Sequence, residues 1–171
     1  MDRNAVQNLM RLEDTLNQSV ERQGQLATLL ERKRTALRRG AVDEMTSLCR
    51  LENAAVQTIS ELEKRRLQLV ADLTLAVEPG AAEPLKMRDL AERLPEPHRG
   101  RLLLTRQKLV DAMQRVQQQT TVTRRASESL LKHMNGLIRT IGVVSQGGAA
   151  YGQTGRVSTK PAPMASLNLT A

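Results

Sequence analysis

Residues that commonly carry nucleophilic or metal chemistry are scarce in this 171-residue chain, which has one cysteine and two histidines. His98 and His133 lie far apart, and neither has a cysteine or carboxylate at the spacing of a metal site. Cys49 lies beside Leu48 and Leu51 on an apolar helix face, where a small buried thiol is more common than a nucleophile. We therefore expect no catalytic residue, no metal site and no cofactor.

Two glycine-rich elements near the end of the chain raise the question of a phosphate-binding loop. They are Gly147-Gly148 and the pair Gly152 and Gly155. Neither follows a predicted strand or opens a predicted helix, and such a loop requires both. We interpret them as flexible sequence, so the chain is predicted to be no enzyme and to have no small-molecule substrate.

The composition favours long helices over a thick globular core. Tyr151 is the one aromatic residue, so Leu and Met are the largest side chains available for burial in the helices. A formal net charge of +8 admits an acidic partner, but no aromatic residue lies in the predicted helices, so base stacking on them is excluded, which argues against nucleic acid.

The same composition bears on where the protein works. No apolar run approaches the roughly 18 residues that a membrane span needs, so we expect no membrane span. One cysteine cannot form an internal disulfide, and Met1 to Asn4 do not resemble the start of a signal peptide. These features predict a cytoplasmic location.

Apolar residues at three- and four-residue spacing predict an all-α fold. Short connections between long helices favour antiparallel neighbours, so we expect an antiparallel bundle of three long helices with a short linker helix and a disordered C-terminal tail. The helical domain is expected over residues 1–141 and the flexible tail over 142–171. Within the domain, the predicted helices are residues 2–38, 43–75, 85–94 and 97–141.

Three residues define the expected helix ends. Gly40, after two arginines, is typical of a helix C-terminus, and Asp43 is expected to cap the next helix through its side chain. Pro84 is expected in the first turn of the short helix, where a missing amide hydrogen is tolerated.

Each long helix is expected to bury one narrow apolar seam. The first seam is interrupted at Ser19, Gln23 and Lys33, and the third is polar from Gln117 to Arg125. That polar stretch predicts either a polar layer that sets register or a loosely packed region. The expected seam residues are Leu9, Leu12, Leu16, Val20, Leu26, Leu30 and Leu37; Met45, Leu48, Leu51, Ala55, Ile59, Leu62, Leu69 and Leu73; and Leu102, Leu109, Met113, Val116, Thr120, Thr123, Leu130, Met134, Leu137 and Ile141.

The end of the third long helix carries more apolar residues than one seam needs. At 100° per residue they cover roughly 120° of the helix surface. Part of this stripe could face a partner helix, and the alternative is that it packs against the first two helices. Its members are Leu130, Leu131, Met134, Leu137, Ile138 and Ile141.

Motifs along nearly the whole chain together resemble one known family. They are Ala36-Leu37-x-x-Gly40-x-x-Asp43, a second helix that ends in Glu63-Lys64-Arg65-Arg66, the linker Leu90-Ala91-x-x-Leu94-Pro95, and Tyr151-Gly152-x-x-Gly155. This pattern resembles the FlgN family of chaperones for flagellar type III export.

The resemblance implies a protein that escorts others and does no catalysis. It implies binding to the hook-associated proteins of the hook–filament junction, prevention of their premature assembly, and delivery to the cytoplasmic domain of the export gate. The expected client-binding residues are Leu130, Met134, Leu137, Ile138 and Ile141, and the expected export-gate docking residues are Tyr151, Gly152 and Gly155. Two other classes stay open at this point: a structural coiled-coil adaptor, and a basic helical protein that binds nucleic acid.

Overall fold

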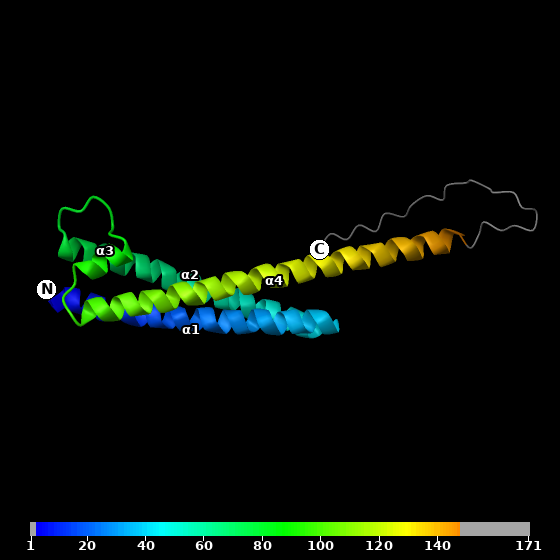
Figure 1. The fold of residues 1–171 in the computed structure, drawn as a ribbon, viewed down its shortest axis with the longest axis horizontal. Helices are drawn as coiled ribbons and strands as arrows, with labels where there is room; N and C mark the ends of the chain where they lie inside the picture. The colour runs from blue at the N-terminus through cyan, green and yellow to red at the C-terminus, as the bar shows by residue number, and fades with distance from the viewer. Residues whose placement is uncertain (1–2, 148–171) are drawn as a thin grey trace, which may run out of the picture. The chain divides into compact units, whose positions relative to one another are not determined.

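The computed structural model describes the backbone of residues 3–147 and the side chains of residues 3–142. Four helices make up this part of the chain: α1 (Arg3–Arg39), α2 (Val42–Val77), α3 (Met87–Glu92) and α4 (His98–Gly147) (Figure 1). No strand occurs among these residues, which confirms the predicted all-α class. The chain divides into two compact units, residues 1–127 and 128–171.

The turn between α1 and α2 has the hydrogen bonds of a Schellman motif. Gly40 has φ of +67°, its N–H donates to the carbonyl of Leu37 at 3.2 Å, and the N–H of Ala41 donates to the carbonyl of Ala36 at 3.0 Å. The predicted helix end at Gly40 is therefore confirmed. Arg38 and Arg39 lie in the last turn, where positive charge interacts favourably with the helix dipole, and α2 returns antiparallel along α1 (Figure 1).

The predicted cap of α2 is wrong. The residue before the helix is Ala41, which makes no side-chain capping bond, whereas Asp43 lies with Glu44 inside the first turn. The carbonyl of Ala41 already accepts the N–H of Met45 at 3.0 Å, so the helix begins before Asp43 can act as a cap. Both carboxylates instead face the positive end of the helix dipole.

The short linker helix is shorter than predicted. It begins at Met87, and Pro84 lies outside it because Lys86, the residue before the helix, has an extended backbone. The hydroxyl of Thr74 accepts the N–H of Leu85 at 3.0 Å and donates to the carbonyl of Val70 at 2.7 Å. Thr74 thus holds the linker against α2 and keeps Leu85 out of a helical turn.

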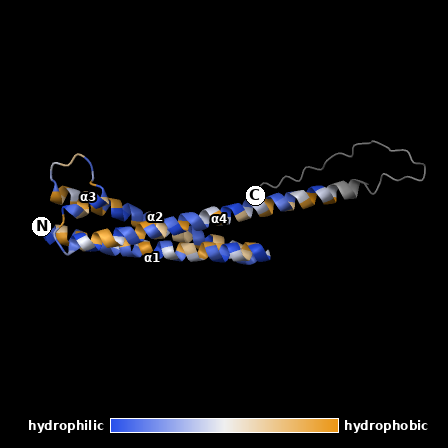
Figure 2. Ribbon diagram, viewed as in Figure 1, coloured by the Kyte–Doolittle hydropathy of each residue, from blue (hydrophilic) through white to orange (hydrophobic). Residues whose placement is uncertain are grey.

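The main core lies where the start of α1, the end of α2, α3 and the start of α4 meet. Figure 2 shows apolar residues on all four elements at this end of the ribbon. Several side chains here are 0% exposed, from every helix of the unit. The cluster consists of Ala5, Leu9, Leu12, Leu16, Leu69, Val70, Leu73, Leu90, Ala91, Leu94 and Leu102.

Most predicted seam residues of α1 and α2 are buried, with two instructive differences. Ser19 and Gln23, which interrupt the predicted seam, are themselves buried, and the hydroxyl of Ser19 donates to the carbonyl of Thr15 at 2.8 Å. Leu51 was expected in the core but is 51% exposed, because it faces an open groove between α1 and α2. Val20 is half-buried.

The polar middle of α4 is continuous helix and contacts α1 through polar side chains. Thr123 is buried, and its hydroxyl donates to the carbonyl of Leu30 at 3.4 Å. Gln119 donates to the carboxylate of Glu31 at 3.1 Å and accepts a hydrogen bond from Arg34 at 3.4 Å. These bonds satisfy polar groups at positions where a leucine seam would otherwise continue.

The predicted third seam is only partly correct, because Met113 and Thr120 are exposed. The helix also continues to Gly147, past the predicted end at residue 141. Gly142 does not stop it, since a single interior glycine costs a helix only about 1 kcal/mol. Within residues 3–147, no helix is long and apolar enough to span a lipid bilayer.

Candidate functional site

The apolar stripe near the end of α4 is exposed along its length. Met134 is 48% exposed, Leu137 50%, and Ile138 and Ile141 64% each. Leu131 is also exposed and Leu130 is half-buried. The structure therefore places all five predicted client-binding residues, together with Leu131, on one helix with apolar surface open to contact.

The stripe arises because a second apolar row joins the first. In the first unit, the buried and half-buried positions of α4 follow one seven-residue pattern, which includes Leu102, Leu109, Val116 and Thr123. The same pattern continues through Leu130 and Leu137. Beside it, Leu131 and Ile138 follow Leu130 and Leu137 by one position, and Met134 and Ile141 follow them by four. Two adjacent rows give a face wider than a two-position seam requires.

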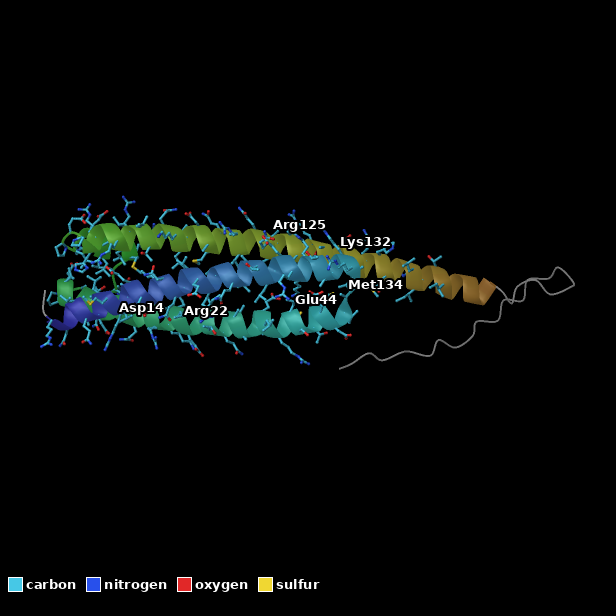
Figure 3. The ribbon with its side chains drawn as sticks, turned by 90° about the horizontal axis from the view of Figure 1, so that it is seen from below. Asp14, Arg22, Glu44, Arg125, Lys132 and Met134 are labelled. Atoms are coloured by element: carbon cyan, nitrogen blue, oxygen red, sulfur yellow. The ribbon has the colours of Figure 1, made fainter. Side chains whose placement is uncertain are left out.

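The opposite side of this helix segment is polar. Figure 3 shows Lys132 and Met134 extending to different sides of α4, as their two-residue spacing requires. Gly136, with open space where a side chain would lie, forms shallow hollows there together with Lys132. An apolar face of this size with a polar reverse side is typical of a surface that packs against another helix.

Burial of the stripe would release substantial free energy. Each large aliphatic or methionine side chain contributes about 1.5–3 kcal/mol when it goes from full exposure to full burial. Met134, Leu137, Ile138 and Ile141 are each about half exposed or more. Their burial against a partner would therefore release several kcal/mol of apolar transfer free energy.

The two histidines both lie on α4 but differ in their contacts. His98 Nδ1 lies 3.5 Å from the Glu13 carboxylate and 3.1 Å from the Arg101 guanidinium, so it joins α1 to the first turn of α4. His133 is exposed on α4. Among the described residues, no group of three or more His, Cys, Asp or Glu side chains could hold a metal ion.

Cys49 is half-buried near an ion pair that joins α1 to α2. Lys33 Nζ lies 2.6 Å from the Glu52 carboxylate. Burial by itself lowers the pKa of Lys33, but the hydrogen bond and charge of Glu52, with a smaller contribution from Cys49, raise it above the usual value. This arrangement stabilises the charged lysine and has the character of a structural contact between the helices.

Tyr151, Gly152 and Gly155 lie outside the described residues. Their predicted role in docking to an export gate therefore stays a prediction from the sequence.

The fold and its exposed surface define an all-α helical-bundle protein with an unpartnered apolar helix face. The model of one protein family, described as FlgN protein, matches residues 1–159 of the chain. The chain belongs to the FlgN family, whose members are flagellar export chaperones and not enzymes. No curated protein and no solved structure matches it at a significant level.

Proposed function

We propose that this protein is a cytoplasmic chaperone for hook-associated proteins of the hook–filament junction. It binds these clients, prevents their premature assembly and delivers them to the flagellar export gate. The exposed stripe from Leu130 to Ile141 is the observation that carries the proposal, and membership of a family of flagellar export chaperones supports it.

The client would bind as an amphipathic helix against the stripe. In this mode, apolar side chains at three- and four-residue spacing on each helix interlock, and the polar sides of both helices stay in water. A client helix held in this way cannot use the same apolar face to assemble with other copies. Binding and prevention of premature assembly are thus one physical event at the surface around Met134 and Leu137.

Amide hydrogen exchange tests where the client binds. The full chain is measured alone and with a purified monomeric hook-associated junction protein. Exchange over residues 130–141 should slow by at least about tenfold when the client is present, because docking suppresses local opening of the helix. Unchanged exchange in this segment, despite complex formation, would place the client elsewhere.

Delivery to the export gate is assigned to Tyr151 with Gly152 and Gly155. Since α4 continues to Gly147, Tyr151 follows the stripe beyond the end of the helix, so the gate could be bound while the client remains on α4. Tyr151→Ala should weaken binding to the purified cytoplasmic domain of the gate by about 1–3 kcal/mol and leave client affinity unchanged. Gly152→Val should also impair gate binding, since glycine allows close approach of the backbone to a pocket.

Titration of each variant with both partners separates the two roles. Equal losses for client and gate would show that Tyr151 belongs to the client site. No loss for either partner would leave Tyr151 without a role in docking.

One observation disfavours a coiled-coil adaptor that oligomerises through its seams. The seam residues of α1 and α2, such as Leu12 and Leu73, are already buried within a single chain. They offer no surface to a second chain without opening the hairpin.

A further inference from the structure

The second unit of the chain is strongly basic for its size. Within residues 128–171, Glu128 is the one acidic residue, and the basic residues are Lys132, Arg139, Arg156 and Lys160. The chain as a whole is much closer to balance, with 26 basic and 18 acidic residues. Neither the client role nor the gate-docking role uses this positive charge. An excess of one sign of charge favours a partner of the opposite sign, so the second unit favours an anionic partner.

The basic side chains on α4 in this unit lie opposite the apolar stripe. At 100° per residue, Lys132 and Arg139 are roughly 145–165° from the centre of the stripe. Figure 3 shows Lys132 and Met134 extending to different sides of the helix. Both basic side chains are exposed, and among the described residues neither takes part in a hydrogen bond or an ion pair. The segment is therefore an amphipathic helix with a wide apolar face and a cationic reverse face.

A helical protein partner on the stripe does not account for these cations. Such a partner would contact the stripe and the positions along its two borders, which are His133 and Thr140 on one side and Glu128 and Asn135 on the other. These borders carry little charge. The reverse face of α4 stays outside this interface, so the cations there need a partner that surrounds the helix.

An anionic lipid surface can meet both faces of the helix at once. A helix that lies in a membrane interface buries its apolar side about 5–10 Å deep, at the boundary of headgroups and acyl chains. Because an α-helix is about 10–12 Å across, its reverse side then lies at the level of the headgroups. Lysine and arginine have long flexible stems that bring their charges to the lipid phosphates, and the negative surface potential extends over a Debye length of about 10 Å.

We propose that the second unit binds anionic lipid bilayers through α4, with Met134 and Ile138 of the stripe in the bilayer surface and Lys132 and Arg139 among the headgroups. The helix lies parallel to the membrane plane and does not cross it. Membrane binding does not rest on the proposed function, since it requires only the exposed stripe and the charges on its reverse side.

Co-sedimentation with lipid vesicles tests the proposal on the full chain without any other protein. One set of vesicles is pure phosphatidylcholine, and the other contains about one third phosphatidylglycerol. The anionic vesicles should bind at least about tenfold more tightly, because each basic residue near an anionic surface raises the affinity about fivefold. Higher salt should remove most of this difference, since ions screen the surface charge.

Paired charge variants show whether the binding is local to the second unit. Lys132→Gln combined with Arg139→Gln should weaken binding to anionic vesicles about twentyfold. Arg99→Gln combined with Arg115→Gln is the matched control, because it removes the same charge at exposed positions of α4 in the first unit. The control pair should lose less than about threefold. Equal losses in both pairs would overturn the proposal, because overall charge would then explain the binding.

Paired apolar variants test the stripe. Ile138→Gln should weaken binding to anionic vesicles about tenfold through lost apolar burial, whereas Leu104→Gln, at a residue that is 58% exposed, should have no effect. In a Cys49→Ser background, an environment-sensitive fluorophore on Ile138→Cys should shift to shorter wavelength when anionic vesicles are added. The same label on Leu104→Cys should not shift, and equal shifts at both positions would contradict the proposed orientation.

Three further results would overturn the proposal. They are no binding to anionic vesicles, equal binding to both kinds of vesicle, and equal losses in Ile138→Gln and Leu104→Gln. Soluble polyglutamate distinguishes an acidic protein surface from a lipid surface. If polyglutamate binds through Lys132 and Arg139 while anionic vesicles do not bind, the partner is an acidic protein and the proposal is wrong.

Discussion

The core end of the first unit and the second half of α4 have the same apolar spacing but differ in what covers it. Leu12 in α1 is 0% exposed, and Leu137 in α4 is 50% exposed. Three- and four-residue spacing therefore predicts that a segment is helical and that one face is apolar. It does not predict whether that face meets the rest of the chain or another molecule.

The difference arises from the number of elements that converge. At the core end, the linker brings Leu90 and Ala91 of α3 against the side chains of three other helices, and both are 0% exposed. In the second unit, the described residues form part of a single helix. Among these described residues no second element covers the apolar face, so the same residue types have a structural role in one region and are proposed to bind a client in the other.

The largest expected effect is on stability at the core end. Leu12→Ala should lower the free energy of unfolding by about 2–5 kcal/mol, because it removes buried surface and leaves a cavity. Leu131→Ala, at a residue that is 60% exposed, should cost less than about 1 kcal/mol. Urea unfolding followed by circular dichroism measures both, and equal losses would contradict the assignment of the two regions.

Substitution of alanine for two glycines should change the stability of the protein in opposite directions. Gly40→Ala should destabilise the protein by about 1–2 kcal/mol, because a β-carbon disfavours the left-handed conformation at φ of +67°. Gly136→Ala should stabilise α4 by up to about 1 kcal/mol, since the position is helical and has open space for a methyl group. Thermal unfolding distinguishes these outcomes, and stabilisation by Gly40→Ala would disprove the proposed turn.

The polar layer between α1 and α4 should contribute less. Thr123→Val keeps the shape of the side chain but removes its hydrogen bond to the carbonyl of Leu30, which should cost about 1 kcal/mol. The exposed Thr121 provides a matched control, because its hydroxyl bonds within its own helix. Urea unfolding measures the free energy of unfolding of both variants. An equal loss in Thr121→Val and Thr123→Val would contradict a stabilising role for the hydrogen bond between α4 and α1.

The smallest effect should come from the ion pair of Lys33 and Glu52. A lysine whose pKa is raised on folding stabilises the protein fully below its unfolded pKa of about 10.5, and this contribution is lost as pH rises through the folded pKa. The loss should be below about 1 kcal/mol, because both side chains are partly exposed. Between pH 9 and 12, the free energy of unfolding of Lys33→Met should lack the decline that the ion pair causes in the unmodified protein. An identical decline in both proteins would disprove the contribution of the ion pair.

The helical class and most of the core follow from the sequence, because apolar periodicity and the helix end at Gly40 are local signals. The exposure of Leu51 does not follow, since its three-residue spacing from Leu48 continues the predicted seam, yet the side chain faces a groove between α1 and α2. The burial of Ser19 and Gln23 is also hidden from the sequence. It depends on which face of α1 meets its neighbours, and polarity alone argues against it.

The candidate client-binding stripe was predictable as an apolar face wider than a seam, but its exposure was not. The choice between a buried and an exposed stripe depends on tertiary contacts, which the spacing of Leu137 and Ile138 does not encode. The docking role of Tyr151 has only sequence support, because that residue lies outside the described part of the chain.

The proposed client-binding role of the stripe is tested by Leu137→Glu, measured by circular dichroism and by titration with a purified hook-associated junction protein. Since Leu137 is half exposed, a carboxylate can stay in water in the free protein but would be buried without a partner in the complex. Leu104→Glu, at a residue of α4 that is 58% exposed, is the matched control. We expect unchanged helical content in both variants and loss of client binding in Leu137→Glu alone. Loss of helical content in Leu137→Glu, or client binding equal to that of the unmodified protein, would contradict it.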